Sequence, residues 1–159
     1  MTEHVTPQPS RYVRPATTLG RITNGFFNSL VAALARAGLS LKGSRVLWVR
    51  GRTSGEWRMT PVNPLRHAGG SYLVAPRGQT QWVRNLRAAG GGELHIGRRV
   101  ERFTAVELAD SDKPDLLRAY LRNWKMEVGI FFDGVGPDAT DEQLLAIAPG
   151  YPVFRITPA

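Results

Sequence analysis

The sequence predicts one small α+β domain, and three observations support this fold class. The chain has 159 residues, a usual length for a single domain. Apolar residues make up 42% of it, which is enough to form a core. The predicted strands come in runs with helices inserted between them, without regular β–α alternation. We therefore expect a flexible arm over residues 1–15 and one folded domain over residues 16–159.

Each predicted element follows from a local pattern. Apolar residues three or four apart predict a helix over residues 17–37, either packed on the core or touching a membrane surface or a partner. Further helices are predicted over residues 79–88 and 111–128, and after the capping box Thr140–Gln143. The buried face of the helix over residues 111–128 is expected to include Leu117, Tyr120, Leu121, Trp124 and Val128. Strands are predicted over residues 46–50, 56–65, 71–75, 93–96, 100–108 and 153–156.

Two details refine the strands. Pro61 and Pro64 cannot donate to a β-ladder, so the strand that contains them should lie at an edge or be bulged. The run Gly90–Gly92 is expected to break the chain before the next strand.

The composition of the chain excludes some kinds of site and favours others. There is no cysteine, and the histidines have no metal-ligand spacing, so we expect neither a disulfide nor a metal site. The polar N-terminus lacks a signal-peptide core, which favours a cytoplasmic location. The net charge of +8 comes mostly from arginine, which suits phosphate binding, although a GC-rich genome would give the same bias.

Two segments carry the candidate chemistry. In Gly51–Val62, two glycines bracket a turn whose amides can face an anion, and Arg58 can point back at it from the returning strand. Alternation along that strand is expected to place Arg58, Thr60 and Val62 on one face. In Ala75–Leu86, a strand runs through a glycine turn into a helix, whose N-terminus is itself an anion site. Taken alone, the first segment could equally be a solvated surface hairpin, and Trp82 in the second could be a core residue.

Together the two segments resemble the deazaflavin-dependent nitroreductase family of F420-dependent oxidoreductases. The shared pattern is Gly-Arg-x-Ser-Gly-x-x-Arg-x-x-Pro-Val, then Arg-Gly and Trp-x-x-Asn-Leu. The resemblance covers about residues 45–108, with a weaker match at residues 152–156. It implies a split β-barrel (the FMN-binding type of fold) and hydride transfer from reduced coenzyme F420 to a quinone, enone or nitro compound.

The resemblance also implies the site residues. The coenzyme phosphate would be held by Arg52, Thr53, Ser54, Gly55 and Arg58, and the rest of the coenzyme would be lined by Pro61, Pro76, Arg77, Gly78, Trp82 and Asn85. Candidates for the substrate pocket are Trp124, Phe131 and Phe132, and Tyr151 is a candidate proton donor, although solvent can serve equally.

Three departures from the family pattern bear on the substrate. Thr53 stands where lysine is common, the loop from Gly78 to Trp82 is short, and the C-terminal region lacks a tyrosine cluster. The alternatives left open are FMN as the coenzyme, a carrier or sensor without turnover, and a basic nucleic-acid-binding module. The sequence is compatible with a monomer or a homodimer.

Overall fold

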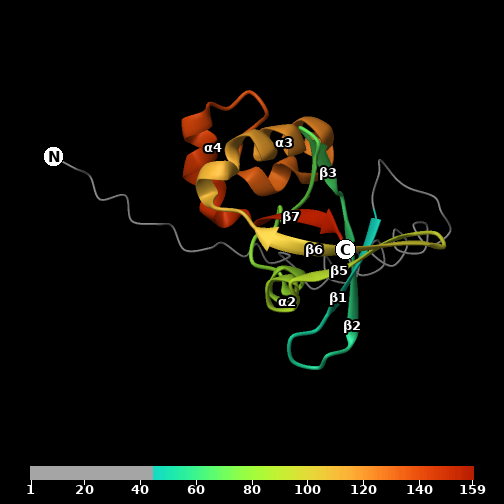
Figure 1. Cartoon of the computed structure of the whole chain (residues 1–159). Helices are drawn as coiled ribbons and strands as arrows, with labels where there is room; N and C mark the ends of the chain where they lie inside the picture. Colours follow the sequence, from blue (N-terminus) through green and yellow to red (C-terminus); the bar gives the residue numbers. More distant parts are fainter. Residues whose placement is uncertain (1–44) are drawn as a thin grey trace, which may run out of the picture.

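A seven-stranded antiparallel sheet carries the fold in the computed structural model, which describes residues 45–159 (Figure 1). The predicted arm over residues 1–15 and the helix predicted over residues 17–37 lie outside the described residues. The strands are β1 Arg45–Arg50, β2 Trp57–Val62, β3 Leu65–His67, β4 Gly70–Val74, β5 Gly91–Ile96, β6 Arg99–Glu107 and β7 Val153–Pro158.

The strand order shows that the sheet is curled. It runs β2-β1-β5-β6-β7-β4-β3, and every neighbouring pair is antiparallel. The edge strands β2 and β3 are separated in the chain by only Asn63 and Pro64. Two strands joined this closely can occupy opposite edges only if the sheet bends round on itself. The result is a half-barrel, and Pro61 lies in an edge strand, as predicted.

Gly91 and Gly92 correct one expectation. They do not break the chain but begin β5, where they pair with Thr104 and Phe103 of β6. A Cβ at Gly91 would lie closer than 3.0 Å to the carbonyl oxygen of Phe103, and one at Gly92 would meet that of Trp48 just as closely. The glycines therefore allow close approach of neighbouring backbones inside the sheet.

Between residues 45 and 159, three α-helices lie on two sides of the strands. They are α2 Gln81–Ala89, α3 Pro114–Val128 and α4 Asp141–Ile147, with short 3-10 turns η1 Asp110–Asp112, η2 Gly129–Phe132 and η3 Ala148–Gly150. Figure 1 shows α2 on one side of β5–β7 and the pair α3 and α4 on the other. The predicted capping box of α4 is present, because Gln143 N donates to Thr140 Oγ1 and Thr140 N donates to Gln143 Oε1.

A two-point ion pair docks α2 on the sheet. Arg87 donates to Glu107 of β6 through Nε at 2.6 Å and through Nη2 at 2.7 Å. The hydrogen bonds that Arg87 donates to this carboxylate raise the pKa of Arg87 above its usual value. Because the pKa of Arg87 is raised by folding, its ion pair stabilises the folded state fully at any pH below the arginine's unfolded pKa. This stabilisation is lost only in strong alkali, so it does not change near neutral pH.

Two cores meet inside the molecule. One fills the half-barrel beneath α2 and includes Leu47, Val49, Leu73, Val83, Leu86, Leu94, Phe103 and Phe154. The other lies beneath α3 and α4 and includes Leu65, Val74, Leu117, Tyr120, Leu121, Trp124, Val128, Phe132, Leu144, Tyr151 and Val153. The candidate site draws residues from both. None of the helices between residues 45 and 159 is long and apolar enough to cross a membrane.

Candidate functional site

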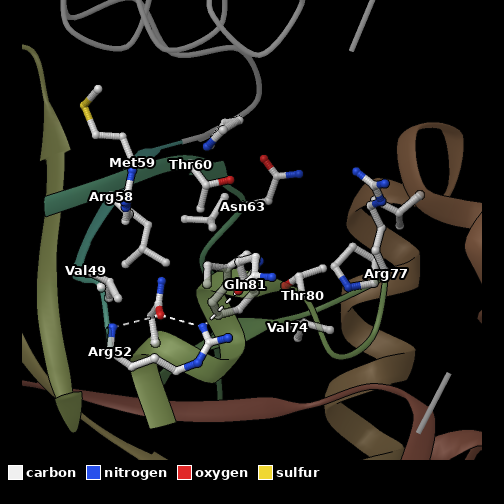
Figure 2. A pocket seen from close by; sticks show the side chains of 18 of the residues that line it. Val49, Arg52, Arg58, Met59, Thr60, Asn63, Val74, Arg77, Thr80 and Gln81 are labelled. Carbon is white, nitrogen blue, oxygen red and sulfur yellow. Dashed lines mark hydrogen bonds between the residues drawn. The ribbon is translucent and has the colours of Figure 1, made fainter. Parts of the chain in front are cut away.

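A pocket of about 970 Å³ opens where the two cores meet (Figure 2). Its walls are the β1–β2 hairpin, the segment from the end of β4 to the start of α2, and the C-terminal half of α3 with η2. It is lined by Leu47, Val49, Gly51, Arg52, Thr53, Ser54, Arg58, Met59, Thr60, Pro61, Val62, Asn63, Val74, Pro76, Arg77, Thr80, Gln81, Trp82, Asn85, Tyr120, Val128 and Phe131. This volume is at the upper end of the range for small-molecule sites, about 300–1,000 Å³.

The turn that joins β1 to β2 is closed by its own hydrogen bonds. Gly51 N donates to Glu56 O at 2.8 Å, and Gly55 N donates to Gly51 O at 2.9 Å. Ser54 Oγ accepts from Glu56 N, which leaves the hydroxyl proton able to donate to a ligand. Gly55 has φ +71°, and a Cβ at Gly51 would lie 2.8 Å from Ser54 Oγ, so both positions favour glycine.

Arg58 lies on the pocket side of β2. It pairs with Val49 across the hairpin, and Thr60 pairs with Leu47. Because paired residues share a face of the sheet, Arg58 and Thr60 point with Leu47 and Val49 into the pocket. The Arg58 side chain is 61% exposed and lies 3.8 Å from the exposed carboxylate of Glu56. Such a long, solvated pair is weak, so an incoming anion can replace it.

Arg52 has a different role, because α2 holds it in place. Its Nη1 donates to Gln81 Oε1 and to Asn85 Oδ1, both at 2.9 Å, and its backbone N donates to Asn85 Oδ1 at 3.2 Å. Asn85 is only 5% exposed. Arg52 therefore braces the turn against α2, and its other guanidinium nitrogens remain available to a ligand.

The second segment forms the adjoining wall. Gly78 has φ +80°, and its N–H donates to Ala75 O at 3.2 Å, which closes a turn that carries Pro76 and Arg77. The Arg77 guanidinium lies 5.9 Å from the centroid of the Phe131 ring. Thr80 is the N-cap residue of α2, yet its side chain makes no capping bond. Its Oγ1 is buried and has no hydrogen-bond partner among the described residues.

Most of the predicted site residues come together at this pocket. The lining includes Arg52, Thr53, Ser54, Arg58, Pro61, Pro76, Arg77, Trp82, Asn85 and Phe131. Gly55 and Gly78 shape the two turns and are not among the residues that line the pocket.

The structure places Trp124, Phe132 and Tyr151 behind this lining. Trp124 packs on Tyr120 with ring centroids 5.0 Å apart, and Phe132 stacks on Tyr151 at 4.3 Å. The Tyr151 hydroxyl donates to Phe131 O, and the side chain is only 8% exposed. All three support the wall that presents Tyr120 and Phe131.

Sequence reasoning did not assign several lining residues to the site, among them Thr60, Asn63, Thr80, Gln81, Tyr120 and Val128. Strand alternation placed Thr60 on the face of Arg58 and could have identified it. Helical periodicity showed that Tyr120 and Val128 are buried, but it cannot show that a buried face borders a pocket.

The pocket suits an anionic coenzyme. Arg52, Arg58 and Arg77 are its charged lining residues, and no carboxylate is among the described residues that line it. A concave site whose charges have one sign attracts ligands of the opposite sign. Next to these arginines, Trp82 and Pro76 offer apolar surface to a flat ring.

The fold and the pocket together define a class of protein, a curled antiparallel half-barrel with an arginine-lined site that suits an anionic small molecule. Within it, the chain matches the family described as F420H(2)-dependent quinone reductase over residues 21–128. That match covers more than half of the chain, which therefore belongs to this family. It is an oxidoreductase, and its coenzyme is F420. The resemblance to F420-dependent oxidoreductases seen in the sequence is confirmed.

Solved structures share the fold. One, described as a domain-swapped dimer, has a TM-score of 0.54 at 16% identity, covering 91% of this chain and all of that one. A second, the F420-H2 dependent reductase FDR-A, has a TM-score of 0.52 at 18% identity, covering 72% of this chain and 94% of that one. These likenesses confirm the split-barrel α+β fold. No curated protein matches the sequence significantly.

Proposed function

We propose that this protein transfers hydride from reduced F420 to a small electron-poor acceptor, a quinone in the first instance and otherwise an enone or a nitro compound. The observation that carries the proposal is the pocket, where an arginine-bearing turn and an apolar wall face one cavity. The family is described by quinone reduction, which favours the quinone.

Two walls of the pocket would bind different parts of the coenzyme. Arg58 and the Ser54 hydroxyl would hold its phosphate, and Arg52 would add a guanidinium fixed against α2. Trp82 and Pro76 would lie along its ring. When bound, the coenzyme supplies the hydride from its C5 carbon. The protein positions the ring and excludes water from it.

The acceptor would occupy the end of the pocket next to α3. Tyr120, Val128 and Phe131 form the wall there. A flat, largely apolar quinone ring suits such a wall. Tyr151 is a weaker candidate for the proton source, because its hydroxyl already donates a hydrogen bond to Phe131 O.

The test is the oxidation of reduced F420 by 2-methyl-1,4-naphthoquinone, followed by the absorbance of the oxidised coenzyme. We expect turnover that requires the protein, is faster than with reduced FMN, and falls strongly in Arg58→Ala. Binding of F420 without turnover with any quinone, enone or nitro compound would contradict the proposed activity and indicate a carrier or sensor.

We also propose a homodimer as the assembled form. One structural neighbour is described as a dimer, and the edge strand β2 exposes Trp57 and Met59 on this chain. Light scattering on the purified full chain distinguishes a dimer from a monomer, and a monomer at micromolar concentration would contradict the proposal.

A further inference from the structure

The pocket has two separate cationic positions. Arg52 and Arg58 belong to the β1–β2 hairpin, whereas Arg77 belongs to the turn between β4 and α2. Figure 2 shows Arg77 on the opposite side of the pocket from the other two. The resemblance seen in the sequence implies a coenzyme contact for Arg77, but a phosphate held at the hairpin turn leaves Arg77 facing a different part of the bound molecules.

The backbone that carries Arg77 is firmly held. Ala75 is fully buried, and its N–H donates to Pro152 O at 2.9 Å. The ring of Pro76 fixes that residue's own φ, and Gly78 closes the turn with φ +80°. The guanidinium then lies 5.9 Å from the Phe131 ring centroid, at the apolar end of the pocket. This end is where the acceptor would bind.

Thr80 supplies a second polar group in the same segment. Its buried Oγ1 has no partner among the described residues, although a buried hydroxyl without a hydrogen bond is destabilising. Thr80 lines the pocket, and Figure 2 shows it near Arg77 on the same wall. A ligand oxygen at this place would complete its hydrogen bonding.

We propose that Arg77 and Thr80 bind a carboxylate carried by the acceptor, so that the enzyme prefers anionic acceptors to neutral ones of the same ring. The inference rests on the proposed function and names the substrate class for that site. A guanidinium binds a carboxylate through two parallel hydrogen bonds, and the hydroxyl can donate a third. The lining residues described contain no carboxylate that would repel it.

The test compares two acceptors that differ only in charge: 2-methyl-1,4-naphthoquinone with a 3-carboxyethyl chain, and its methyl ester. Their quinone rings are the same, so a difference in kcat/KM between them reports recognition of the carboxylate. We expect the parent protein to favour the acid by about tenfold or more, as for a charge-assisted contact. In Arg77→Met the acid-to-ester ratio should fall to about one. Arg84→Met, an exposed position on α2 outside the pocket, should leave the ratio unchanged.

Two measurements without turnover accompany the kinetics. The dissociation constants of acid and ester for the coenzyme-free protein, read by quenching of tryptophan fluorescence, should show the same preference and the same loss in Arg77→Met. Thr80→Val should reduce the preference about threefold, yet raise the melting temperature, because it replaces an unsatisfied hydroxyl by a methyl group.

The proposal is overturned if the parent treats acid and ester alike. It is also overturned if Arg77→Met weakens F420 binding as strongly as Arg58→Ala does, because Arg77 would then be a coenzyme contact. Failure of the proposed function looks different: the parent would reduce neither acceptor with F420, while the coenzyme-free protein would still bind the acid more tightly than the ester.

Discussion

At the scale of single residues, the two arginines of the β1–β2 hairpin have different roles. Arg52 is tied to Gln81 and Asn85 by hydrogen bonds of 2.9 Å and holds the turn against α2. Among the described residues, the charged partner of Arg58 is a solvated carboxylate 3.8 Å away, a weak contact that a bound anion can replace. The two should therefore respond differently to substitution.

Arg58→Ala should weaken F420 binding about ten- to hundredfold, because a charge-assisted contact contributes about 1.5–3 kcal/mol. Its effect on stability should stay within about 0.5 kcal/mol, as for an exposed side chain. Arg58→Lys should recover part of the binding, since an ammonium cannot make the planar two-point contact. Fluorescence titration and thermal unfolding measure the two effects. Unchanged affinity for both F420 and FMN would show that Arg58 is not part of a phosphate clamp.

Asn85→Ala should affect folding and binding together. It removes the acceptor of two hydrogen bonds from Arg52 at a position only 5% exposed. We expect a loss of about 1–3 kcal/mol in the free energy of unfolding and weaker F420 binding, because the turn is no longer braced. Denaturant unfolding measures the loss of stability, and fluorescence titration measures the loss of F420 affinity. A variant of parental stability that binds F420 normally would contradict the bracing role.

At the scale of elements, the pairing of β5 with β6 and β1 depends on glycine. Gly91→Ala should lower the free energy of unfolding by about 1–3 kcal/mol, because the new Cβ would press on the backbone carbonyl of Phe103. Gly150→Ala is the matched control, since nothing lies within 4 Å of a Cβ there. Equal melting temperatures for the two variants would contradict the close approach of β5 and β6.

The strands and helices also show which features of the site could be predicted from the sequence. Strand alternation and the bracketing glycines correctly predicted that Arg58 faces the same side as Thr60, because both signals are local. The role of Gly91 depends on a neighbouring strand, so the glycine run was wrongly expected to break the chain. The hydrogen bond from Arg52 to Asn85 spans 33 residues and had no local signal. Likewise, periodicity showed that Tyr120 is buried but not that it borders the pocket.

At the scale of the whole molecule, the curled sheet brings the site together. Its edge strands are joined through Asn63 and Pro64, and this closure sets the hairpin turn opposite the β4–α2 turn with α3 beside both. The site is thus assembled from segments far apart in the sequence and should fail as a unit when the half-barrel opens.

Removal of residues 1–14 should leave the fold and F420 binding intact. This segment is polar, bears prolines and shows no apolar periodicity. Thermal unfolding and coenzyme titration of the truncated chain test the expectation. A large fall in melting temperature would show that the segment is structural.

The most direct test of the account is a side-by-side titration of the full chain with F420 and with FMN, repeated with Arg58→Ala. The account predicts micromolar binding of F420, weaker binding of FMN, and a loss of about ten- to hundredfold in F420 affinity in the variant. Equal or tighter binding of FMN, or an Arg58→Ala protein that binds F420 as well as the parent does, would contradict it.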